Sequence, residues 1–137
     1  MVLRKSLILA VFLAAPTNLA HASELDLLAS TVYLEARGAS KREKFLVART
    51  VINRRAHKSF PSSIKKIVKG KKQYAHNKLV NKNSTAYKDS LDAVKKALMT
   101  PANPKSILYF HDKSYKKGFD WARPLIKTRN FTFYGDK

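Results

Sequence analysis

The chain has 137 residues, no cysteine, and a formal net charge of +19, with 28 lysines and arginines against 9 aspartates and glutamates. This composition fits one domain without disulfides and excludes cysteine-based catalysis, and the 4 glycines form no glycine-rich phosphate loop. So large an excess of positive charge attracts polyanions.

The first 22 residues have the layout of a secretory signal peptide. Arg4 and Lys5 precede the apolar run 7–15, and Ala20-His21-Ala22 supplies a small-x-small cleavage site. We expect cleavage after Ala22, which makes the protein secreted or periplasmic. One functional domain over residues 23–137 then remains, and the loss of Arg4 and Lys5 reduces its net charge from +19 to +17. The alternative is a retained N-terminal membrane anchor.

Export changes the meaning of the positive charge. Outside the cytoplasm the available polyanions are the anionic cell wall, lipopolysaccharide and lipid headgroups, whereas inside it they are nucleic acids. We therefore expect the anionic cell envelope as partner and no nucleic acid.

Residues 24–37 are predicted to form a helix with one carboxylate on its apolar side. Leu28, Val32 and Glu35 follow the i, i+4, i+7 spacing of a single helical face. Gly38 is expected to end the helix in a left-handed conformation.

Two interpretations of Glu35 remain open at this point. A carboxylate at the edge of an apolar face has its pKa raised by desolvation and can donate a proton near neutral pH. Alternatively, Glu35 forms a structural ion pair with Arg37, Arg49 or Arg54.

Three further helices are predicted. Ser40 and Glu43 form a capping box that begins a helix ending near His57. A short helix spans residues 62–69, and Ser84 or Thr85 begins another, which the prolines after Thr100 terminate. The inward stripe of this last helix is expected to contain Tyr87, Leu91, Val94, Ala97 and Leu98.

The last third of the chain contains two β-prone runs, residues 107–111 and 131–134, which predict a short antiparallel pair packed on the helices. The expected fold class is therefore α+β and mainly helical, in a small single domain.

Most catalytic constellations are missing. No serine lies in a nucleophile-elbow context, and His57, His76 and His111 have no metal-ligand spacing, so we expect no metal. Carboxylates are scarce, and one acid suffices for glycoside cleavage when a hydroxyl of the substrate is the nucleophile. Aromatic residues are candidates for the walls of a sugar groove: Tyr33, Tyr74, Tyr109, Phe110, Trp121 and Tyr134.

Six segments, in order, resemble motifs of the spore-cortex-lytic (SleB-type) cell-wall hydrolases. The first, Tyr33-Leu34-Glu35-Ala36-Arg37-Gly38, resembles the Tyr-x-Glu-Ala-Arg-Gly signature of that family. The others are Val47 to Arg54, Phe60-Pro61-Ser62-Ser63-Ile64, Gln73-Tyr74, Leu108-Tyr109-Phe110-His111 with Trp121-Ala122, and Phe131 to Tyr134. The resemblance extends over about residues 26–135.

The resemblance implies a lysozyme-like catalytic domain that acts on peptidoglycan without metal or cofactor. It implies Glu35 as the catalytic acid of a lytic transglycosylase, which cuts the MurNAc–GlcNAc bond and leaves a 1,6-anhydro-muramyl end. Two positions depart from the family pattern: Ala39 replaces an acidic residue, and Arg129-Asn130-Phe131 replaces Gly-Asn-His.

Our leading hypothesis is an exported peptidoglycan-cleaving enzyme, a monomer, with Glu35 as general acid and then base. The candidate substrate-binding residues are Tyr33, Arg37, Asn53, Gln73, Tyr74, Tyr109, His111 and Trp121. The alternative is a catalytically weakened cationic protein that binds the envelope or its peptidoglycan.

Overall fold

The computed structural model describes residues 24–69 and 80–137. The predicted signal peptide with its cleavage site, and the candidate groove residues Gln73 and Tyr74, lie outside these ranges. In the part of the chain that is described, no helix is long and apolar enough to cross a membrane.

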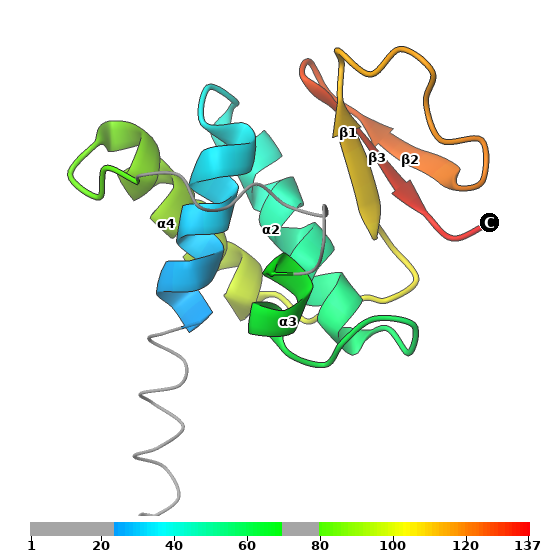
Figure 1. The fold of residues 1–137 in the computed structure, drawn as a ribbon, viewed down its shortest axis with the longest axis horizontal. Helices are drawn as coiled ribbons and strands as arrows, with labels where there is room; N and C mark the ends of the chain where they lie inside the picture. Colours follow the sequence, from blue (N-terminus) through cyan, green and yellow to red (C-terminus); the bar gives the residue numbers. More distant parts are fainter. Residues whose placement is uncertain (1–23, 70–79) are drawn as a thin grey trace, which may run out of the picture.

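A helical part and a small sheet lie side by side (Figure 1). The chain is helical over residues 24–36, and α2 (Lys41–Ala56), α3 (Ile64–Val68) and α4 (Thr85–Met99) follow. Strands β1 (Tyr109–Asp112), β2 (Arg123–Lys127) and β3 (Phe131–Gly135) complete the fold. The predicted α+β, mainly helical class is confirmed.

Helices α2, α3 and α4 each begin at a serine cap, as the sequence predicts for two of them. The side-chain oxygens of Ser40, Ser63 and Ser84 accept hydrogen bonds from backbone N–H groups three residues ahead. The predicted end of α2 near His57 is also confirmed.

Helix α2 is the centre of the molecule, because it contacts α3, α4 and β1. Its burial is not confined to one stripe: Val47, Ala48, Val51 and Ile52 are buried, and so are several polar residues. The helix at residues 24–36 adds Leu28 and Val32 to the same core.

Three sequence-based expectations are wrong in detail. The sheet has three antiparallel strands in the order β1-β3-β2 and not a pair, because β2 was not recognised. The first helix ends in a turn in which Ala39 N–H bonds to the carbonyl of Ala36, and Gly38 does not adopt a positive φ. Leu98 is 36% exposed, so it lies outside the inward stripe of α4.

Candidate active site

Glu35 lies in the last turn of the first helix, at the edge of the core. Leu28 and Val32 are fully buried and Glu35 is half-buried, as the predicted stripe requires. Its side chain borders a cleft of about 430 Å³ between the helical part and the sheet. The other lining residues come from α2, β1, the loop after β1, and β3: Arg54, Phe110, His111, Asp112, Ser114, Tyr115, Phe119 and Phe131.

Arg54 brings a fixed positive charge into this cleft. Its side chain is almost entirely buried, and its Nε donates a hydrogen bond of 2.5 Å to the carbonyl of Leu108. Its guanidinium carbon lies 4.8 Å from the ring centre of Phe60 and 5.6 Å from that of Tyr109. These contacts hold the Arg54 guanidinium in place in the cleft that Glu35 also lines.

Arg49, a second candidate ion-pair partner for Glu35, points elsewhere. Its guanidinium donates to the carbonyls of Ala97, Thr100 and Pro101 at 3.1, 2.7 and 2.5 Å. Burial lowers the pKa of Arg49, although an arginine stays charged at any pH at which the protein is folded. This side chain is a structural group at the end of α4.

The wall opposite the helices is aromatic. His111 Nδ1 lies 2.8 Å from the carbonyl of Asp112, so this nitrogen carries the proton and Nε2 accepts from the hydroxyl of Tyr134 at 2.7 Å. The ring of Phe119 lies 4.9 Å from that of His111 and stacks on Trp121 at 5.0 Å. Gly118, with φ of +73°, makes the turn that brings Phe119 into this group.

Tyr109 and Trp121 extend this wall away from Glu35. Their rings meet edge to face at 4.8 Å, and Trp121 is 55% exposed. The Tyr109 hydroxyl donates to Asp136 at 3.1 Å. Burial, together with this bond to a carboxylate, raises the pKa of Tyr109, so the hydroxyl keeps its proton at neutral pH. Exposed aromatic faces held by such contacts are suited to sugar rings.

Asp112, which with Asp120 is the sequence-based candidate for a second carboxylate if the mechanism needs one, lies in the cleft. Its Oδ1 accepts hydrogen bonds from the hydroxyl of Ser114 and, at 2.8 Å, from the backbone N–H of Ser114. These bonds lower the pKa of Asp112, the hydroxyl bond most.

Two predicted groove residues are structural. Tyr33 is 1% exposed and meets Tyr87 edge to face at 6.2 Å, inside the core. Asn53 is also 1% exposed, donating to the carbonyl of Ile107 and accepting from the N–H of Asn103, both at 2.9 Å. Neither side chain can touch a substrate in this structure.

The other predicted substrate-binding residues in the described part of the chain lie either at the cleft or away from it. The structure brings His111 into the cleft with Glu35, and Tyr109 and Trp121 adjoin it. Arg37 is exposed, and its guanidinium carbon lies 5.1 Å from the ring centre of Tyr33. Among the described side chains, no group of three or more His, Asp or Glu is placed to hold a metal ion.

A mainly helical domain with a helix-end carboxylate facing a small antiparallel sheet is a lysozyme-like architecture. The profile of the cell wall hydrolase family matches residues 38–134, and the chain belongs to this family. The matched range begins at Gly38, so Glu35 lies three residues before it.

Two solved structures share the fold. The catalytic domain of the germination-specific lytic transglycosylase SleB from Bacillus anthracis is 19% identical, with a TM-score of 0.66, and the alignment covers 81% of this chain and 93% of that one. The crystal structure of the catalytic domain of the Bacillus cereus SleB protein is 23% identical, with a TM-score of 0.61, covering 81% and 88%. A comparison with curated proteins finds no sequence match.

Proposed function

We propose that the protein is an exported lytic transglycosylase that cuts the MurNAc–GlcNAc bond of peptidoglycan with Glu35 as its single acid and base. The observation that supports this best is the position of Glu35, half-buried on a rigid helix and facing an aromatic wall across one cleft. The family match and the fold of the two SleB domains supply the substrate class.

The proposed reaction needs no water and no second carboxylate. Glu35 donates its proton to the glycosidic oxygen, and the bond between that oxygen and C1 of MurNAc breaks. The C6 hydroxyl of the same MurNAc then attacks C1, and the Glu35 carboxylate takes the hydroxyl proton. Arg54, in the same cleft, attracts the carboxylate form that Glu35 takes between the two proton transfers.

Substrate contacts are assigned to side chains that line or adjoin the cleft. Trp121 and Tyr109 provide faces for sugar rings, and His111 and Arg54 provide polar groups within the cleft. Arg37, Gln73 and Tyr74 remain candidates from the resemblance alone.

The test is digestion of purified peptidoglycan, with the products identified by mass spectrometry. Muropeptides with 1,6-anhydro ends, one water lighter than hydrolysed products, are the expected result. Reducing ends would contradict the one-carboxylate mechanism and make Asp112, which lines the cleft, and then Asp120 the next candidates. Absence of soluble products with continued pelleting on the wall would favour the cationic binding protein.

A further inference from the structure

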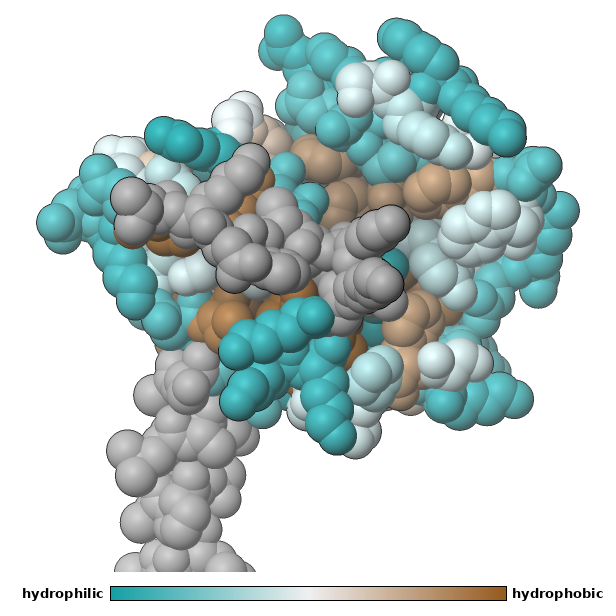
Figure 2. Space-filling model, in the orientation of Figure 1, coloured by the Kyte–Doolittle hydropathy of each residue, from teal (hydrophilic) through white to brown (hydrophobic). Residues whose placement is uncertain are grey.

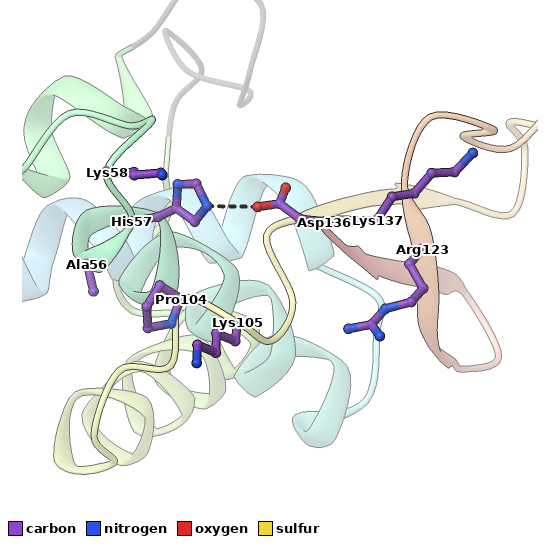
Figure 3. Close-up of a pocket in the computed structure, with 8 residues that line it drawn as sticks. All are labelled: Ala56, His57, Lys58, Pro104, Lys105, Arg123, Asp136 and Lys137. Atoms are coloured by element: carbon purple, nitrogen blue, oxygen red, sulfur yellow. Dashed lines mark hydrogen bonds and ion pairs between the residues drawn. The ribbon is translucent and has the colours of Figure 1, made fainter.

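The largest of the clefts described here lies apart from Glu35, between the end of α2 and the sheet. It has a volume of about 560 Å³ (Figure 3). Ala56, His57, Lys58, Pro104 and Lys105 line it from the helical side, and Arg123, Asp136 and Lys137 line it from the sheet side.

Positive charge in this cleft is not neutralised locally. Lys58, Lys105 and Arg123 are exposed, and none of them forms an ion pair with the described part of the chain. Figure 3 shows Arg123 extending from β2 toward the helical side, whereas the Lys137 amino group points away from it. The cleft therefore presents cations from both of its walls.

The one acidic side chain of the cleft is already occupied. Ser59 N–H donates to Nδ1 of His57 at 3.0 Å, so Nε2 carries the proton and donates to Asp136 at 2.8 Å. The other oxygen of Asp136 accepts from the hydroxyl of Tyr109. Both oxygens of Asp136 therefore have partners within the chain, and no ion pair in the described part of the chain joins Asp136 to the lysines or to Arg123, whose charges can meet an incoming anion.

Arg54 and Tyr109 link the basic cleft to the Glu35 cleft. Arg54 lines the Glu35 cleft and lies over the ring of Tyr109, and the hydroxyl of Tyr109 reaches Asp136 in the basic cleft. Strand β1 runs from Tyr109 to Asp112, and Asp112 lines the Glu35 cleft. Three residue steps along a strand are roughly 10 Å, a span that one disaccharide repeat of a glycan strand covers.

We propose that the basic cleft binds the carboxylates of a stem peptide carried by the same glycan strand that is cut at Glu35. The inference rests on the proposed function, because it takes peptidoglycan as the substrate. Stem peptides combine free carboxylates with alanine methyl groups. The cations of the cleft match the carboxylates, and the apolar surfaces of Ala56 and Pro104 match the methyl groups.

The test compares soluble glycan strands, freed of other wall polymers, with and without their stem peptides. The cleft variant is Lys105→Gln/Arg123→Gln. Its matched control is Lys88→Gln/Lys95→Gln, two exposed lysines of α4 that line neither the basic cleft nor the Glu35 cleft. For stem-bearing strands the cleft variant should show a KM increased about three- to tenfold with kcat unchanged. Denuded strands and the control variant should show no change.

A binding measurement separates this inference from the proposed function. Stem-bearing strands are titrated calorimetrically into Glu35→Gln protein with and without the cleft substitutions, so that no turnover is needed. Weaker binding in the cleft variant alone supports the inference even if no cleavage is ever found. Equal losses in the cleft and control variants, or equal losses for denuded strands, overturn it in favour of diffuse attraction.

A third experiment tests phosphate, the other common anion of cell walls, as the ligand of the basic cleft. Soluble polyglycerol phosphate is titrated into the same proteins. If the cleft substitutions weaken binding of this polymer and leave stem-bearing strands unaffected, the cleft is a phosphate site and the inference is overturned.

Discussion

Two carboxylates reach the same cleft in different surroundings. Asp112 accepts two hydrogen bonds from Ser114, which lower its pKa and keep it ionised near neutral pH. Glu35 borders a cleft that includes the rings of Phe110 and Phe131. Because a proton donor must hold its proton at working pH, the lowered pKa of Asp112 makes it poorly suited to donate one.

Glu35→Gln should abolish cleavage and leave the fold intact. The amide keeps the shape of the side chain and removes the titratable proton, so the rate should fall by about 10² to 10⁴ or more. Muropeptide release and the melting temperature are measured together. Glu24→Gln, the same substitution in the same helix, is the control, because Glu24 pairs with Arg55 at 3.3 Å and lies outside the cleft. An active Glu35→Gln protein would contradict the assignment of Glu35 as the catalytic acid.

The sequence predicted the position of Glu35 at the edge of the core better than the burial of its neighbours. The motif and the apolar stripe both pointed to Glu35, but residue type alone placed Tyr33 in the groove. Ala29, Tyr33 and Ala36 are all buried and form a second stripe with i, i+4, i+7 spacing. Because the sequence-based stripe did not include Ala29 and Ala36, the predicted buried face of the first helix was narrower than the observed one.

At the scale of elements, polar residues of α2 hold the segment that joins α4 to β1. Arg49, Asn53 and Arg54 donate hydrogen bonds to carbonyls at the end of α4 and in the residues that follow, up to Leu108. Arg49 and Asn53, four residues apart, lie on the same face of the helix, and Arg54 lies on the adjacent face. They fix the start of β1, and with it the aromatic wall, relative to Glu35.

Arg49→Met should lower the free energy of unfolding by about 2–4 kcal/mol. The substitution keeps much of the side-chain length, but it leaves three carbonyls without their charged donor, two of them from the last turn and cap of α4. Urea unfolding measures the loss. Arg42→Met, at an exposed position of the same helix, should change the free energy by less than about 0.5 kcal/mol. Equal effects of the two substitutions would contradict the structural role of Arg49.

The same contacts show what a sequence can and cannot predict about elements. Serine caps and helical periodicity are local, so α2 and α4 were predicted closely. The partners of Arg49 and Asn53 are about fifty positions away in the chain, and no local pattern identifies them. Strand β2 was missed because it contains Pro124 and is mostly exposed, which is tolerated only at the edge position that it occupies.

Asp26 joins the first helix to α4 and should make stability depend on pH. It accepts a 2.7 Å bond from the hydroxyl of Tyr87 and lies 2.9 Å from the amino group of Lys82. The Tyr87 bond, then that of Lys82, lowers the pKa of Asp26 below its ordinary 3.8. A carboxyl whose pKa is lowered by folding stabilises the fold above its unfolded pKa and loses that effect as the pH falls through the folded pKa.

Asp26→Asn should therefore destabilise the protein at pH 6 and have a smaller effect at pH 2. Because half of the Asp26 side chain is exposed, solvent screening keeps the effect modest, and melting temperatures at the two pH values are the measurement. Asp92→Asn, at an exposed position of α4, is the control. A destabilisation that is the same at both pH values would show that shape, and not charge, is what Asp26 contributes.

At the scale of the whole molecule, the exposed positive charge of the described residues is spread over several elements and extends well beyond the basic cleft. The exposed lysines and arginines are distributed over the helices, the loop after β1 and β2. Figure 2 shows hydrophilic side chains around most of the rim of one face, with apolar side chains reaching the surface nearer its middle. Such a distribution attracts a polyanion in many orientations, whereas orientation for cleavage depends on the groove.

Retention on the wall should therefore weaken sharply with salt while the cleavage site stays the same. The Debye length shortens from about 10 Å at 0.1 M to about 3 Å at 1 M, so exposed charges stop acting together over the surface. Pelleting of Glu35→Gln protein with insoluble peptidoglycan across this range measures binding without digestion. Acetylating the lysines is the control, because it removes charge and should abolish the salt dependence. Binding that is insensitive to salt would mean that contacts with the glycan itself, and not the positive charge of the protein, hold it to the wall.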